Sequence, residues 1–210
     1  AILDVATGTG DVGFAILKHH KVNIIGLDYS FNMVLHAQGK AKNKGFSEDF
    51  KFVQGDGENL PFEDNCFDAV ISIDVVMHLP DRTQKFSELW RVLAPGGRFL
   101  FTDACIVNGS LSDEDIQIRS HYGSSHFVPD EFNESALVSA GFSLEKKEQH
   151  SDGLIAICSG RWKVREKYKK ELVAEFGETA FEHEQTYLKR LVELYSEKRL
   201  LRYVYLVKKQ

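Results

Sequence analysis

Cysteine is scarce in this sequence of 210 residues: it has three, Cys66, Cys105 and Cys158, and they lie far apart. No two of them have the spacing of a zinc site or of a redox pair. An odd number also leaves at least one thiol without an intramolecular partner. The simplest interpretation is three free thiols in a reducing compartment, and this predicts a cytoplasmic location.

Long apolar runs and an excess of positive charge are also missing. No stretch approaches the length of a membrane span, and the pattern of a signal peptide is not expected within these residues. The formal net charge of -5 at pH 7 argues against a partner held through its phosphate backbone. Basic residues do gather between 161 and 170, but glutamates alternate with them, which is typical of a solvated helix face. The sequence therefore predicts neither a nucleic-acid partner nor a membrane span.

Short apolar runs alternate with helical patterns over the first hundred residues. The runs predict strands over 2–5, 22–27, 50–53, 67–73 and 98–102. Helices are predicted over 12–19, over 33–44 before Gly45, and from an N-cap at Asp81 to the turn at 95–97. Strands separated by crossover helices predict an α/β fold: a Rossmann-like, mostly parallel sheet with helices on both faces.

The regular alternation of predicted strands and helices ends after Asp103. Helices are predicted over 113–120, 129–140, 152–176 and 178–199, and strands over 142–149 and 200–208. An apolar stripe along 154–176 is expected to be core. We interpret the chain as one domain, 1–210, with a core over 1–103 and a helical cap over 104–140 and 152–199 that covers the ligand edge of the sheet. Because the sequence begins inside a strand, we expect a further segment before Ala1.

The strongest local signal is the run 4–13, DVATGTGDVG. Gly8, Gly10 and Gly13 satisfy the G-x-G-x-x-G pattern between a strand and a helix, which alone is weak evidence for a nicotinamide dinucleotide. Asp4 and Asp11 weigh against that cofactor, since a carboxylate repels phosphate but tolerates an ammonium group. S-adenosylmethionine has no phosphate and carries an amino-acid end and a sulfonium, so it fits this loop better.

Acidic residues also follow the next three predicted strands. Asp28 ends the second strand, where a carboxylate can accept hydrogen bonds from both ribose hydroxyls. Asp56 follows the third strand, where it can accept from an adenine amino group, and Asp74 ends the fourth. Ligands of open α/β sheets bind beyond the carboxyl ends of the strands. The predicted cofactor-binding residues are Asp4, Ala6, Thr7, Gly8, Gly10, Asp28, Tyr29, Met33, Gly55, Asp56, Gly57 and Asp74.

Together these features resemble one family, the class I S-adenosylmethionine-dependent methyltransferases. The run 4–10 is similar to its glycine motif, Asp28 and Asp56 occupy its ribose and adenine positions, and the run 91–97, RVLAPGG, is similar to its late motif. The resemblance covers residues 1 to about 103. It implies a seven-stranded sheet whose last strand, 200–208, is antiparallel, and it implies S-adenosylmethionine as cofactor.

The segment 74–78, DVVMH, places Asp74 and His78 four residues apart around a strand end. It resembles the phosphoethanolamine and glycine/dimethylglycine N-methyltransferases, in which an Asp and a His at this spacing line the substrate site. The resemblance implies methyl transfer to a small-molecule amine. We expect His78 to accept the proton and Asp74 to orient the substrate or the imidazole, because imidazoles have pKa values near neutrality.

Other interpretations stay open. The run 6–11 also looks like quinone C-methyltransferases, and phenol O-methylation is a further alternative. Asp74, Asp103 and Asn108 could imitate a magnesium site, but the last two are wrongly spaced for adjacent ligands, so no metal is predicted. His121 and His126 are more typical of surface loop histidines than of pocket residues. A non-catalytic, cofactor-binding scaffold domain is the second class of function, and a nicotinamide enzyme is the third.

Overall fold

The computed structural model describes residues 1–120 and 123–210, which divide into two compact units. The first unit comprises residues 1–102, 131–147 and 204–210, and the second comprises 103–130 and 148–203. His121 therefore lies outside the described residues. The predicted single domain with a cap over 104–140 and 152–199 stays a prediction, and the helix near 132–139 belongs to the first unit. That the helices of the second unit cover a substrate stays a prediction.

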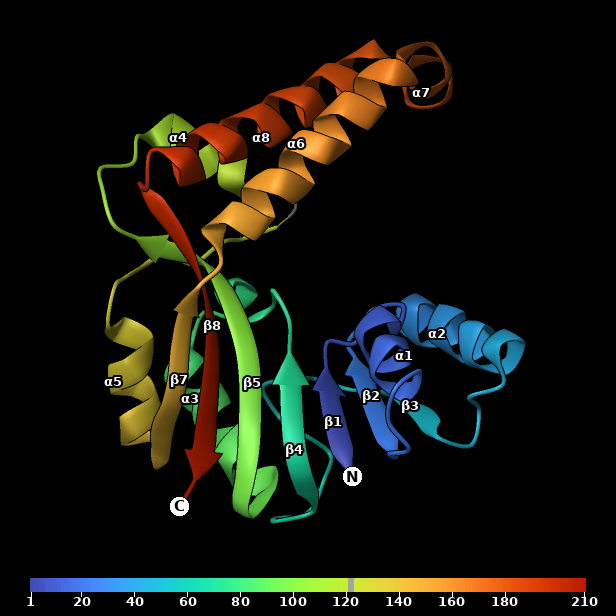
Figure 1. The fold of residues 1–210 in the computed structure, drawn as a ribbon, viewed down its shortest axis with the longest axis vertical. Coiled ribbons are helices and arrows are strands. Elements are labelled where there is room, and N and C mark those ends of the chain that lie inside the picture. The colour runs from blue at the N-terminus through green and yellow to red at the C-terminus, as the bar shows by residue number, and fades with distance from the viewer. Residues whose placement is uncertain (121–122) are drawn as a thin grey trace. The chain divides into compact units, whose positions relative to one another are not determined.

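The sheet has the predicted Rossmann-like class and strand directions. Its order is β3-β2-β1-β4-β5-β8-β7, and the two-residue strand β6 (Val128–Pro129) pairs with β5 off this path. Neighbours among β1 to β5 are parallel, whereas the arrow of β8 points opposite to those of β1 and β4 (Figure 1). The seven long strands are β1 (Ile2–Val5), β2 (Ile24–Asp28), β3 (Phe50–Gln54), β4 (Phe67–Ser72), β5 (Leu93–Val107), β7 (Phe142–Gln149) and β8 (Leu200–Lys209).

The helices of the first unit lie where the sequence predicts them, and the predicted ends at Gly45 and Asp81 are confirmed, whereas α2 begins two residues earlier and α5 three residues later than predicted. Ser30 accepts a hydrogen bond from the Met33 N–H at the start of α2, and Gly45, with φ of 75°, ends it. Asp81 caps α3 by accepting the Gln84 N–H at 2.9 Å. The bounds are α1 (Asp11–Leu17), α2 (Phe31–Lys44), a 3₁₀ turn (Val76–His78), α3 (Arg82–Val92) and α5 (Phe132–Ser139).

The second unit contains α4 (Asp113–Arg119), α6 (Ser151–Lys167), α7 (Lys169–Phe176) and α8 (Glu178–Ser196). The helix predicted over 152–176 is broken at Tyr168, and its apolar stripe is not core. Ile157 is 60% exposed and Phe176 is 59% exposed, whereas Cys158 is buried. The reason is that α6 packs against α8 through the side that carries Cys158, as Figure 1 shows for the two helices. Cys158 is part of the stripe, but its other members are exposed or half-buried, so the stripe as a whole is not core.

An ion-pair cluster ties α4 to the end of α8. Asp115 is buried and accepts hydrogen bonds from Arg190 at 2.6 Å and from Arg199 at 3.0 Å. Burial raises the pKa of this carboxyl, but the bonds from Ser112 and Arg190 outweigh burial and lower the pKa to about 2. Removing only the arginines would destabilise the fold strongly, because the Asp115 charge would be left buried without a partner.

Aromatic side chains fill the core between α1 and the sheet. The rings of Phe14, Phe50 and Phe52 lie in contact, with the Phe50 and Phe52 centroids 4.2 Å apart. A Cβ added to Gly13 would lie 2.3 Å from the Phe50 ring, so α1 can approach the sheet only with glycine there. This close packing sets the position of the loop that precedes α1.

Candidate functional site

The loop between β1 and α1 is held in an unusual backbone conformation. Ala6, Gly8 and Gly10 have φ values of 58°, 54° and 79°, in the left-handed region. A Cβ added to Gly8 would meet nothing within 4 Å, whereas one added to Gly10 would lie 3.0 Å from the Phe14 ring. The two glycines therefore differ in purpose. Gly10 allows the helix to pack, and Gly8 leaves open space in which a ligand can approach the backbone.

Asp28 holds this loop to the end of β2. Its Oδ2 accepts the Gly8 N–H at 2.7 Å, and its Oδ1 accepts the Ser30 N–H at 2.9 Å. A carboxylate has about four lone-pair positions, so each oxygen can accept one further hydrogen bond. Asp28 thus has the position and the remaining acceptor capacity predicted for a ribose ligand. Its second role, as a support of the glycine loop, was missed from the sequence.

Asp4 lies beneath the loop and is almost fully buried. The Thr7 hydroxyl donates to its Oδ2 at 2.7 Å. Burial raises the pKa of Asp4 to about 6; the Thr7 hydrogen bond opposes this rise and the nearby charge of Asp28 adds to it. Because a neighbouring cation would favour the charged form of this carboxyl, an ammonium group suits this end of the loop.

The Asp11 carboxylate, predicted to repel a phosphate group, is paired with a lysine. Lys40 of α2 donates to its Oδ1 at 2.7 Å, and the Thr9 hydroxyl donates to its Oδ2 at 2.8 Å. These hydrogen bonds, that from Lys40 first, lower the pKa of Asp11. A carboxylate already paired with a lysine repels phosphate weakly, so the argument against a nicotinamide cofactor depends on Asp4 and not on Asp11.

The residues after β2 and β3 lie next to this loop. The Gly55 N–H donates to the Asp28 carbonyl at 3.0 Å, and the Gln54 side chain donates to the Tyr29 carbonyl at 3.2 Å. Tyr29 is 78% exposed, an unusual position for a large ring, and the Met33 side chain is exposed in the first turn of α2. Exposed apolar groups beside the Asp28 carboxylate, which can accept further hydrogen bonds, suit a flat nucleoside. The predicted residues of β1, β2 and β3 therefore meet at one edge of the sheet.

Asp74 lies after β4 in a strained conformation. Its φ of 55° is rare for a residue with a side chain, and such outliers gather at functional sites. Thr102 stabilises it twice: its hydroxyl oxygen accepts the Asp74 N–H at 2.7 Å and donates to the Asp74 carboxylate at 2.7 Å. Thr102 was missed from the sequence, although it ends the predicted strand beside Asp74. His78 ends the 3₁₀ turn with an exposed side chain, and its backbone N–H donates to the Val75 carbonyl at 2.8 Å.

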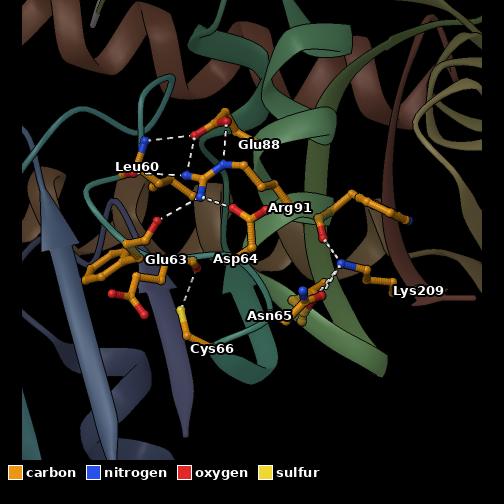
Figure 2. A network of polar contacts seen from close by, with 11 residues as sticks. Leu60, Glu63, Asp64, Asn65, Cys66, Glu88, Arg91 and Lys209 are labelled. Atoms are coloured by element: carbon orange, nitrogen blue, oxygen red, sulfur yellow. Dashed lines mark hydrogen bonds and ion pairs between the residues drawn. The ribbon is translucent and has the colours of Figure 1, made fainter.

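One side of α3 holds the loop between β3 and β4 (Figure 2). The Arg91 guanidinium donates to the carbonyls of Phe62 at 2.7 Å and Leu60 at 3.1 Å, and to the Asp64 carboxylate at 2.9 Å. Glu88 binds Arg91 and accepts the Leu60 N–H at 3.1 Å. Arg91 begins the late motif recognised in the sequence, and here it supports the loop that carries Asp56. No group of three or more metal-ligating side chains occurs among residues 1–120 and 123–210.

A family model described as a methyltransferase domain matches residues 3–101. The chain belongs to the class I methyltransferases. The matched range contains the glycine loop, Asp28, Asp56 and the segment 74–78, on which the resemblance was based. The predicted S-adenosylmethionine-dependent family is thereby confirmed.

Relatives of this methyltransferase chain act on different acceptor atoms. A phosphoethanolamine N-methyltransferase of Triticum aestivum is 28% identical over 86% of the chain and 35% of its own length. A sterol 24-C-methyltransferase of Aspergillus fumigatus is 34% identical over 72% of the chain and 42% of its own length. The chain thus spans well under half the length of these curated relatives.

A solved structure supports the fold assignment. The phosphoethanolamine N-methyltransferase 2 of Haemonchus contortus, in complex with phosphomonomethylethanolamine and S-adenosylhomocysteine, has a TM-score of 0.88 and 22% identity. The similarity covers 99% of this chain and 48% of that one. In the described part of the methyltransferase chain, no helix is long and apolar enough to cross a membrane.

Proposed function

We propose that this chain is a catalytic S-adenosylmethionine-dependent methyltransferase whose acceptor is a small molecule with an amine nitrogen. The observation that carries the proposal is the open space in front of Gly8, whose N–H is bound by Asp28, in a loop whose Thr7 is bound by the buried carboxylate of Asp4. This edge offers acceptors for a ribose and an acid for an ammonium end, with no cationic side chain of the kind that would pair with a pyrophosphate among the predicted site residues.

The residues fit S-adenosylmethionine in three parts. Asp28 would accept the ribose hydroxyls with its two remaining lone-pair positions. Tyr29 and Met33 would lie against the adenosine, with Asp56 accepting from its amino group. The loop 6–10 and Asp4 would hold the amino-acid end, because the loop follows β1 directly and the Asp4 carboxylate is bound to its Thr7. The full set proposed is the predicted one, including Thr7, Gly10, Gly55, Gly57 and Asp74.

The chemistry asked of the protein is modest. S-adenosylmethionine brings a methyl group already activated by its sulfonium. The chain's own residues must place the acceptor in line and remove one proton, since an amine is mostly protonated near neutral pH and then has no lone pair. We propose that Asp74, held by Thr102, orients the amine and that His78 accepts its proton, directly or through water.

An amine is preferred because the match to the N-methyltransferase of Triticum aestivum extends over 86% of the chain, well beyond the cofactor half. Methyl transfer to carbon is the second candidate, favoured by the sterol 24-C-methyltransferase relative, which covers 72% of the chain at higher identity. The two differ in the acceptor atom and share the cofactor site.

The experiment has two stages. Calorimetry first compares S-adenosylhomocysteine with NAD; we expect micromolar binding of the former and none of the latter, and the reverse order would overturn the cofactor proposal. Labelled methyl transfer is then measured with phosphoethanolamine, glycine and dimethylglycine, beside sterol, quinol and phenol acceptors. Label on an amine supports the proposal, and label on carbon selects the second candidate. Cofactor binding with no labelled product from any acceptor would favour a scaffold domain.

A further inference from the structure

Lys85 is a lysine with no exposed surface on the inner side of α3. Its ammonium donates a hydrogen bond to the carbonyl of Gly57, in the loop after β3. Lysines are almost never fully buried unless they are paired. The sequence alone gave Lys85 no role, because a lysine within a polar helical stretch is normally exposed.

The absence of a side chain at Gly57 leaves room for the Lys85 ammonium. A Cβ added to Gly57 would lie 2.6 Å from Lys85 Nζ and 3.2 Å from Cγ1 of Val5, the last residue of β1. The ammonium therefore occupies the place where a side chain of residue 57 would lie. Gly57 therefore lies between the end of β1 and α3, and the Lys85 ammonium supports this part of the proposed site from the α3 side.

The peptide unit that joins residues 57 and 58 transmits this contact to Asp56. Its carbonyl accepts from Lys85, and its N–H, on Glu58, donates to Oδ1 of Asp56 at 2.9 Å. Because a trans peptide is planar, its C=O and N–H point in opposite directions. Fixing the carbonyl therefore fixes the direction of the N–H, and with it the Asp56 carboxylate.

We propose that Lys85 is a positioning residue for the adenine end of the cofactor site, acting through the 57–58 peptide on Asp56. The inference rests on the proposed function, since it needs Asp56 to accept from an adenine amino group. Lys85 itself touches no part of the cofactor. Its role is to hold one carbonyl so that the carboxylate on the other side of the same peptide is correctly aimed.

The surroundings of Lys85 make this contact sensitive to pH. Asp56 and Glu58 face it from the loop and Glu88 from its own helix, and all three favour the ammonium. Burial is the larger effect and lowers the pKa of Lys85 to about 8. Between pH 7 and 9 the Gly57 carbonyl thus exchanges a charged donor for a neutral one, which makes the weaker bond.

The test measures binding of S-adenosylhomocysteine and of 5′-methylthioadenosine, which keeps the adenosine and lacks the amino-acid end. We expect Lys85→Met to weaken both ligands by the same factor, fivefold or more. Lys147→Met is the matched control: Lys147 also lies in the first unit, and its ammonium pairs with the Glu134 carboxylate of α5 and not with α3 or its loop. That variant should bind both ligands within twofold of the unchanged chain.

The pH dependence gives a second readout, which the unchanged chain alone can provide and which Lys85→Met extends. Methylthioadenosine has no group that titrates near pH 8, so its affinity for the unchanged chain should fall by threefold or more from pH 7 to pH 9. The affinity of Lys85→Met should stay level. Equal affinity of Lys85→Met and the unchanged chain, or a level profile for the latter, would overturn the role of Lys85 alone. Failure of the unchanged chain to bind either ligand would overturn the proposed function and this role with it.

Discussion

The carboxylate of Asp28 accepts the backbone N–H of Gly8 at 2.7 Å, across the gap between the ends of β2 and β1. The side chain proposed to bind the ribose therefore also stabilises the loop proposed to bind the amino-acid end of the cofactor. Binding and local stability are coupled in one residue, and substitutions at Asp28 should change both.

Asp28→Ala should lower the melting temperature of the ligand-free chain and weaken S-adenosylhomocysteine binding by tenfold or more. The substitution leaves the Gly8 and Ser30 N–H groups without their acceptor, at a cost of about 1–3 kcal/mol in the free energy of unfolding. Thermal unfolding and calorimetry measure the two effects. Asp28→Asn keeps one acceptor oxygen, so its melting temperature and its affinity for S-adenosylhomocysteine should fall less. An unchanged melting temperature for Asp28→Ala would show that water replaces the Asp28 carboxylate as the acceptor of the two N–H groups.

Asp4→Asn should alter how stability depends on pH. The pKa of Asp4 is about 6 in the folded chain against 3.8 ordinarily, so the folded chain holds the proton more tightly. The stabilising contribution of this group is complete below pH 3.8 and is lost as pH rises through about 6. The difference corresponds to about 3 kcal/mol in the free energy of unfolding.

Urea unfolding between pH 4 and 7 checks this sign: the unchanged chain should lose stability relative to Asp4→Asn as pH rises. Asp11→Asn is the control. The pKa of Asp11 is lowered by Lys40, so its contribution is present above pH 3.8 and is lost as pH falls. Parallel curves for the unchanged chain and Asp4→Asn would contradict the raised pKa.

Thr102→Val should reduce turnover about tenfold and cost about 1–3 kcal/mol of stability, because it removes both hydrogen bonds that hold Asp74 in its left-handed conformation. Thr102→Ser keeps the hydroxyl and should restore most of both. Methyl-transfer rates and thermal unfolding give the comparison. If valine and serine behave alike, the hydroxyl of Thr102 does not hold Asp74.

His78→Ala should lower kcat on the identified acceptor by about a hundredfold and leave S-adenosylhomocysteine affinity unchanged, since the imidazole is proposed to accept a proton and not to bind the cofactor. His126→Ala, on a histidine predicted to be a surface residue, serves as the control for removing an imidazole. Unchanged kcat in His78→Ala would mean that the acceptor reaches the site already deprotonated.

Much of this architecture follows from local signals. The apolar run at β1 and the segment after Gly141 at β7 predict those strands with their observed bounds, because apolar runs and glycines that end a helix are short-range features. The caps at Asp81 and Gly45 are equally local. The break at Tyr168 has no such signal, since neither glycine nor proline lies there, and it was missed.

Some residues of the candidate site can be predicted from local signals and others cannot. Asp28 and Asp74 are found from the sequence because strand ends are predictable and ligands bind beyond them. Lys40, Thr102 and Lys85 are not, because each acts on a residue 28 or 29 positions away, and only the packing of parallel strands and helices brings them together. Nothing near Lys85 in the sequence shows that residue 57 leaves room for its ammonium.

The bonding of α3 to the loop after β3 has a consequence for the dynamics of the first unit. Lys85, Glu88 and Arg91 bind the loop from Gly57 to Asp64, and the Asn65 and Cys66 N–H groups donate to the carbonyls of Arg91 and Val92. A segment tied to a helix at so many points opens only when the helix opens, so the two form one cooperative unit of local unfolding. Amide protons of α3 and of this loop should exchange with a common opening free energy. A substitution that frays α3 would then make Asp56 more mobile without touching it. Cofactor affinity would fall, because the loop would lose more conformational entropy on binding, although no contact to the cofactor is removed.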